Sequence, residues 1–172
     1  MKQITIKGKH QQEKINKTHN PKRTSTQKLN LTCDDIAFKK QIEYINKLYM
    51  EEDYKYADFI KKELNTKLSG YKKQDIDNEK LDNEKLITYD KTLELLVASK
   101  LKCKYCHHEM HILYDNVRQN NQWTLDRIDN DYGHNHDNVL ISCLECNIKR
   151  KRMNMDRFQF SKDCVNIKKL EY

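Results

Sequence analysis

Apolar residues recur every three or four positions in two stretches between residues 34 and 70, which is the spacing of one face of a helix. The apolar positions are Phe38, Ile42, Ile45 and Tyr49 in the first stretch and Ala57, Ile60, Leu64 and Leu68 in the second. Asp34 or Asp35 is expected to cap the first helix, and Gly70 to end the second. Two short amphipathic helices need a partner for their apolar faces, so we expect a helical hairpin.

A charged segment separates this part from the rest of the chain. Residues 77–86 read DNEKLDNEKL, a five-residue tandem repeat that we expect to be a linker or an extension of the preceding helix. Beyond it, Asp90 is expected to cap a helix that leads into Cys103. We therefore predict a border between a helical part, residues 31–86, and a C-terminal module, residues 87–157.

Inside that module the pattern becomes alternating and β-like. WTLDRID, residues 123–129, and NVLIS, residues 138–142, are expected to form short strands joined by the loop DYGHNHD. LECNIKRKRM, residues 144–153, is expected to form a helix. The predicted fold class is α+β, with a mostly helical N-terminal part and a C-terminal strand–strand–helix module.

Charge is concentrated at the two ends of the chain. Residues 1–30 hold eight Lys and Arg and one Glu, have almost no apolar side chains, and are expected to be a disordered basic tail. Residues 158–172 are expected to be a basic C-terminal segment. Polyanion binding is one reading of these ends, and a solvated tail that aids solubility is the alternative for residues 1–30. The oligomeric state does not follow from the sequence.

The start of the chain has no apolar core of a signal peptide, and no run of apolar residues is long enough to cross a membrane. We therefore expect an intracellular protein, neither secreted nor membrane-bound. In such a compartment paired cysteines indicate a metal rather than disulfides.

Two Cys-x-x-Cys pairs stand 36 residues apart, and each can place two thiolates on a tight turn. Their members are Cys103, Cys106, Cys143 and Cys146. Four thiolates suit tetrahedral Zn²⁺ and fill its coordination sphere, so the expected zinc is structural. The 36-residue gap is longer than that of a simple zinc ribbon, and it contains the two predicted strands.

This order of motifs resembles the HNH endonuclease family. Its elements are Cys-x-x-Cys, then LDRIDN, then Gly-His-x-x-x-Asn-Val, then Cys-x-x-Cys-Asn-x-x-Arg. The match covers roughly residues 88–157 and is similar to the zinc-clasped ββα-metal type of phages, mobile elements and large DNA viruses. The resemblance implies an endonuclease that cleaves DNA, or RNA as well, in the cytoplasm or nucleus of a host cell.

The resemblance also implies roles for individual residues. Asp126 and Asn147 match the ligands of a catalytic cation, and their oxygens suit Mg²⁺ or Mn²⁺. Asn138 matches the residue that braces the loop between the strands. Arg150, one turn beyond Asn147, is expected to hold a phosphate. The nucleic-acid-binding set implied in this way is Arg127, Lys149, Arg150 and Arg152.

The position of the family's catalytic histidine holds Arg127, which cannot accept a proton at neutral pH. Side chains alternate faces along the predicted strand, so Asp129 is expected to share the face of Arg127 and is one candidate base. His134 and His136 in the loop are the other candidate bases, and an imidazole is the better base by its ordinary pKa. We order the candidates His134, Asp129, His136, with Arg127 binding phosphate.

Three functions remain open at this point. The first is a metal-dependent DNA endonuclease with a structural zinc. The second is a non-catalytic zinc module that binds nucleic acid. The third is a zinc-clasped protein-interaction module, which leaves Asp126, Asn138 and Asn147 unexplained.

Overall fold

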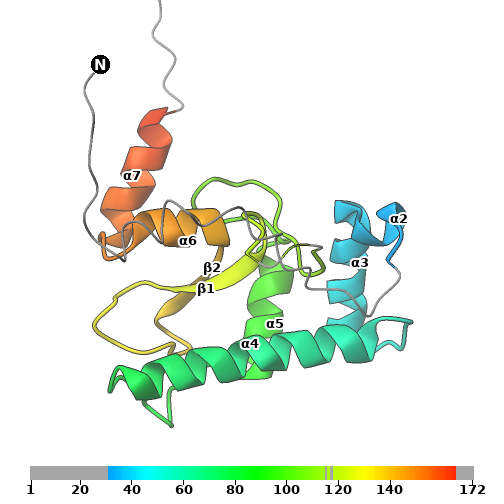
Figure 1. Cartoon of the computed structure of the whole chain (residues 1–172), viewed down its shortest axis with the longest axis horizontal. Helices are drawn as coiled ribbons and strands as arrows, with labels where there is room; N and C mark the ends of the chain where they lie inside the picture. Colours follow the sequence, from blue (N-terminus) through cyan, green and yellow to red (C-terminus); the bar gives the residue numbers. More distant parts are fainter. Residues whose placement is uncertain (1–30, 115, 117, 166–172) are drawn as a thin grey trace, which may run out of the picture.

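The computed structural model describes residues 31–114, 116 and 118–165, and the predicted N-terminal tail lies outside this range. The fold is α+β, about half helical, with one small antiparallel sheet (Figure 1). Its elements are α2 (Cys33–Ile36), α3 (Phe38–Tyr49), α4 (Ala57–Asp77), α5 (Tyr89–Ala98), β1 (Trp123–Arg127), β2 (Val139–Cys143), α6 (Leu144–Arg150) and α7 (Met155–Val165). Among the described helices, none is long and apolar enough to span a membrane.

The first helices begin at residues other than those predicted. Thr32 caps the short helix α2: its hydroxyl accepts a hydrogen bond from the backbone N–H of Asp35, and the Asp35 carboxylate accepts one from the backbone of Thr32. This reciprocal arrangement is a capping box, so Asp35 is its third helical residue and not the cap. Likewise Thr88, and not Asp90, caps α5. In both cases the cap is a threonine that precedes the predicted aspartate by two or more residues, and its hydroxyl accepts a hydrogen bond from an N–H group of the first helical turn.

Helix α4 does not end at Gly70 as predicted but continues to Asp77. Glycine in a helix costs only about 1 kcal/mol relative to alanine. Two residues beyond it are held by the rest of the molecule. The hydroxyl of Tyr71 accepts a hydrogen bond from the backbone N–H of Leu125, and Asp75 binds His134. These contacts of the last turns of α4 offset the cost of the glycine.

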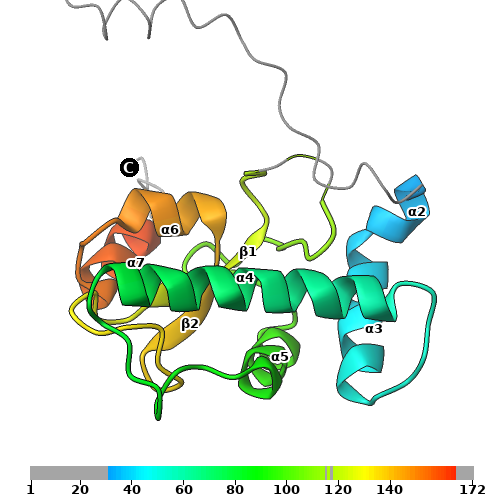
Figure 2. The same cartoon turned by 60° about the horizontal axis from the view of Figure 1, so that its bottom comes forward.

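The predicted helical hairpin is also wrong. Helix α3 lies across one end of α4 and packs chiefly against α5 (Figures 1 and 2). Gln41 on α3 is fully buried, and its side-chain oxygen accepts hydrogen bonds from the backbone N–H groups of Ile112 and Leu113. One apolar core therefore runs from α3 to the first turns of α7 and crosses the predicted border at residue 86.

The strands form an antiparallel pair whose register places Trp123 opposite Cys143 and Arg127 opposite Val139. Strand β1 ends at Arg127, two residues earlier than predicted, and β2 is shifted by one residue to 139–143. Asp129 is therefore a loop residue, so the argument that it shares a strand face with Arg127 is wrong. Helix α6 follows β2 directly and ends at Arg150, three residues before the predicted end.

The charged segment 78–86 lies along the loop between the strands. Leu86 forms a β-bridge with Asn135, and the N–H of Ile87 donates to the carbonyl of His134. At Gly133 the loop lies close to the end of α4 and to the backbone that follows it. A Cβ at this position would lie 2.9 Å from a carboxylate oxygen of Asp75 and would clash with the carbonyl of Lys80. This close approach requires glycine at position 133.

Candidate functional site

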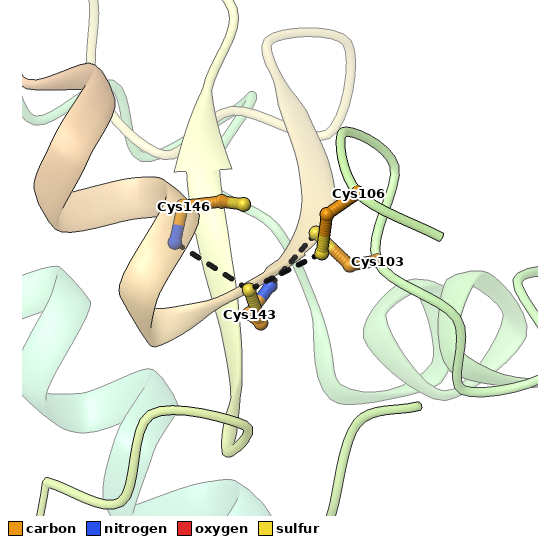
Figure 3. A group of neighbouring side chains, drawn as sticks. All are labelled: Cys103, Cys106, Cys143 and Cys146. Atoms are coloured by element: carbon orange, nitrogen blue, oxygen red, sulfur yellow. Dashed lines mark hydrogen bonds between the residues drawn. The ribbon is translucent and has the colours of Figure 1, made fainter. Parts of the chain in front are cut away.

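Four cysteines gather at one side of the strand pair. The sulfur atoms of Cys103, Cys106, Cys143 and Cys146 all lie within 4.8 Å of one another (Figure 3). Two come from the turn before the strands, one ends β2, and one lies in the first turn of α6. Residues 40 positions apart in sequence thus meet at one point, as the spacing of the two pairs predicts.

The geometry of this cluster fits a tetrahedral metal ion. Zinc–sulfur bonds of about 2.3 Å separate two tetrahedral ligands by about 3.8 Å, and the sulfurs of Cys106 and Cys143 are 3.8 Å apart. The backbone supports the thiolate form: the N–H of Cys143 donates to the sulfur of Cys103, and that of Cys146 to the sulfur of Cys143. Hydrogen bonds among the sulfurs hold the pKa of Cys103 far below its usual range and raise the pKa of Cys143 and of Cys146, so a metal ion has to displace the protons of those two thiols. The four residues can hold a zinc ion, whose chemistry here is to join the two ends of the strand–strand–helix unit.

Asp126 lies on β1, buried beneath the surface, and both of its oxygens are engaged. The hydroxyl of Tyr105 donates to Oδ2 at 2.7 Å, and the guanidinium of Arg150 donates to Oδ1 at 2.8 Å. Burial raises the pKa of Asp126, and the hydrogen bond from Tyr105 and the charge of Arg150 oppose that rise. The carboxylate is thus matched by a cation of the protein itself.

Arg150 occupies the interior and is only 1% exposed. Besides Asp126, its guanidinium donates to the carbonyl oxygens of Arg127 and Ile128 at 2.6 and 2.7 Å. Arg150 therefore joins α6 to the end of β1. Its two terminal nitrogens are engaged with the protein, where the resemblance implies a contact with phosphate.

This geometry does not fit the expected Mg²⁺ or Mn²⁺ site. The side-chain N–H groups of Asn147 donate to Thr124 and to the carbonyl of Leu125, both at 3.1 Å, which brings Asn147 beside β1. Its amide oxygen has no hydrogen bond within the described residues. However, Asp126 is held by Arg150, whose positive charge opposes a second cation at the same carboxylate.

Asn138 fastens both ends of the loop between the strands. Its side-chain oxygen accepts from the N–H of Asp129, and its side-chain nitrogen donates to the carbonyls of Asp129 and Gly133 at 2.9 and 3.0 Å. These bonds close the loop that carries His134.

His134 points inward against α4. Its Nδ1 lies 2.8 Å from one carboxylate oxygen of Asp75, and its backbone N–H donates to the other oxygen at 2.7 Å. An ionised carboxylate only accepts hydrogen bonds, so Nδ1 carries the proton and the lone pair lies on Nε2. Burial lowers the pKa of His134, against the opposing effect of Asp75. Nε2 has no hydrogen bond among the described residues, and the His134 side chain is only 4% exposed, so Nε2 is the unpartnered nitrogen of a nearly buried ring.

Arg127 lies half-buried at the end of β1, with one guanidinium nitrogen 3.3 Å from the carbonyl of Tyr132. Its positive charge contributes to lowering the pKa of His134 and opposes the rise in the pKa of Asp126. Asp129 is exposed and accepts from the N–H of Asp131. His136 is exposed, with Nδ1 beside the carbonyl of Lys85 and no carboxylate partner in the described chain.

A concave surface adjoins this region. It is a groove of about 700 Å³ between the end of α4, the loop after β1 and the connection from α6 to α7. Arg127, Arg150 and Arg152 line it, whereas Lys149 does not and pairs instead with Glu145. The structure thus brings together three of the four predicted nucleic-acid-binding residues and separates the fourth.

Three residues that position this region escaped the sequence analysis: Asp75, Tyr71 and Tyr105. The ring of Tyr71 packs on that of His134 with 4.6 Å between ring centroids. The only sequence signal for Asp75 is a polar residue inside the helical stretch after Gly70. Its partner lies 59 residues away, so no local pattern identifies it.

No protein-family model, no curated protein and no solved structure matches this chain. The functional assignment therefore rests on the residues and their geometry.

Proposed function

We propose that this protein is an endonuclease that hydrolyses phosphodiester bonds of DNA, built on a zinc-clasped strand–strand–helix unit of the HNH type. The observation that carries the proposal is the pair formed by Asp75 and His134 beside Arg127. A neutral imidazole with one nitrogen held by a carboxylate and the other without a partner among the described residues is the arrangement of a general base.

The order of elements supports the same class. The unit runs β1, β2, α6, and its ends meet at the cysteine cluster. The resemblance to HNH endonucleases rests on this order together with Asp126, Asn138 and Asn147. In such a unit the zinc would hold the frame, and the chemistry would take place at the loop and the end of β1.

The chain's own residues define the following steps. Arg127 binds a phosphate oxygen and brings the phosphorus to Nε2 of His134. His134 Nε2 takes a proton from a water molecule as that water attacks the phosphorus, the bond from phosphorus to the leaving sugar oxygen breaks, and that oxygen takes up a proton from solvent. Asp75 keeps Nδ1 protonated and stabilises the imidazolium that forms, because its carboxylate accepts the Nδ1–H bond. The position matching the family histidine thus serves for binding, and the base comes from the loop.

The proposal assigns no step to Mg²⁺ or Mn²⁺. The pairing of Asp126 with Arg150 leaves the carboxylate without the open oxygens that a hydrated divalent cation requires. Whether cleavage requires an added cation is therefore a result of the test and not a premise of the proposal.

The pairing of Asp126 with Arg150 also favours a second candidate function, because it leaves no open carboxylate for a catalytic cation. In this alternative the module is a non-catalytic zinc protein that binds nucleic acid through Arg127 and Arg152. This alternative leaves the Asp75–His134 pair as a buried structural contact.

A nicking assay on supercoiled plasmid separates the two functions. Zinc-loaded protein is tested without added cation, with Mg²⁺ and with Mn²⁺, beside the variant His134→Gln. Cleavage by the parent that falls by about 10²–10⁴ in the variant supports the endonuclease, because that is the usual contribution of a general base. DNA binding without cleavage under all three conditions supports the second candidate.

A further inference from the structure

Unpaired positive charges gather around the groove described above. Lys80, Arg127, Lys151 and Arg152 line it, and none forms an ion pair with a carboxylate that the structure describes. Lys80 reaches the groove from the end of α4 and donates to the carbonyl of Asn130 across it. Cations without a carboxylate partner keep their charge available to an anionic ligand.

Two of the three carboxylates of the groove lie near backbone N–H groups. Asp129 accepts from the N–H of Asp131, and Asp156 lies in the first turn of α7, where the helix end is positive. Asp131 is the third acidic residue of the lining. The lining therefore holds five basic residues and three acidic ones, so the positive charge exceeds the negative.

Apolar surface lies in the same place. Ile128 and Met153 line the groove and are 37% and 40% exposed. Tyr132 does not line the groove but belongs to the adjoining loop: it is 62% exposed, and its backbone carbonyl accepts a hydrogen bond from the guanidinium of Arg127, which does line the groove. A ring, apolar side chains and cations together offer contacts to both a base and its phosphate.

We propose that this groove binds an unpaired, single-stranded segment of nucleic acid, with phosphates on Lys80, Lys151 and Arg152 and a base on Tyr132. The groove has the volume of a small-molecule site, which admits nucleotides one at a time. A base stacks on a side chain only when it has left its own duplex. That this strand is the substrate rests on the proposed endonuclease function. The binding of the strand does not depend on cleavage.

The decisive quantity is the ratio of single-strand affinity to duplex affinity. Both affinities are measured by fluorescence anisotropy on the full zinc-loaded chain without added Mg²⁺ or Mn²⁺. The probes are a labelled single strand of about 12 nucleotides, a length within the range of single-strand sites, and the duplex of the same sequence. Tyr132→Ala should weaken single-strand binding by about 5-fold or more, the minimum expected from one stacked base. Its duplex binding should stay within about twofold, so the ratio should fall.

Tyr132→Ala and a second test variant, Arg152→Gln, each have a matched control. Tyr49→Ala removes an exposed tyrosine from the end of α3, a helix that contributes no residue to the groove, and should leave the ratio unchanged. Arg152→Gln should reduce the dependence of log affinity on log salt by about 0.7, the value for one phosphate contact of a single strand. Arg157→Gln removes an exposed arginine of α7 that does not line the groove, and it should leave that slope unchanged.

The proposal is overturned if Tyr132→Ala weakens both forms of DNA equally or neither of them, or if Arg152→Gln behaves like Arg157→Gln. If the parent leaves DNA intact even with Mg²⁺ or Mn²⁺ while the ratio responds to Tyr132, the groove is supported and the endonuclease proposal fails. If the parent cleaves DNA but the ratio does not respond to Tyr132→Ala, the endonuclease proposal is supported and the groove proposal fails.

Discussion

Replacing Asp126 with alanine should destabilise the whole fold and not only abolish cleavage. The substitution leaves the guanidinium of Arg150 without its carboxylate in a place where both side chains are almost fully buried. It also removes the acceptor of the Tyr105 hydroxyl. Breaking a buried ion pair by removing one partner costs about 3–5 kcal/mol, which is a large part of the about 5–15 kcal/mol that stabilises a domain.

The assay is urea unfolding of zinc-saturated protein, followed by the fluorescence of Trp123, the single tryptophan of the chain, which is buried on β1. A loss of about 4 kcal/mol at a slope of about 2 kcal/mol per molar urea lowers the midpoint by about 2 M. Asp129→Ala, which removes an exposed aspartate three residues further on, should cost less than about 1 kcal/mol. It is the matched control.

A double variant tests the physical cause. Asp126→Ala with Arg150→Met removes both charges, so its loss of stability should be smaller than the sum of the two single losses. It should not recover fully, because the carbonyls of Arg127 and Ile128 lose their donor. An Asp126→Ala protein that unfolds at the parent's midpoint but no longer cleaves DNA would refute the reasoning and favour Asp126 as an accessible cation ligand.

Three further outcomes are expected. Purified protein should contain about one zinc per chain, and a chelator or Cys103→Ser should unfold it, since such sites contribute on the order of 10 kcal/mol; Cys33→Ser, at an exposed cysteine outside the cluster, is the control in elemental analysis and unfolding. Because burial holds the pKa of His134 below its ordinary 6.5, the unfolded chain takes up its proton first as pH falls. Stability should therefore decrease below about pH 6.5 and the decrease should be smaller in His134→Gln; equal pH dependence would contradict the buried neutral histidine. Removing residues 1–30 takes away eight basic and one acidic residue and should weaken DNA binding and its salt dependence, and an unchanged salt slope would show that the tail does not contact DNA.

The sequence by itself determined the features that short-range chemistry encodes. The two Cys-x-x-Cys pairs predicted the four-sulfur cluster, because a tight turn places two thiolates together and zinc needs four. Periodicity predicted α3, α5 and the two strands, because the face that an element buries repeats with its own geometry. Errors there were confined to ends, where Thr32 and Thr88 act as caps and β1 stops at Arg127.

Only the tertiary structure decided which polar groups meet. Asp75 and His134 are 59 residues apart, and Asp126 and Arg150 are 24 apart, so no local pattern pairs them. Those pairings also changed the local outcome, because α4 continues past Gly70 where its last turns bind β1 and the loop. A buried charge must find a partner wherever the fold provides one, and the choice of that partner is a property of the packed molecule.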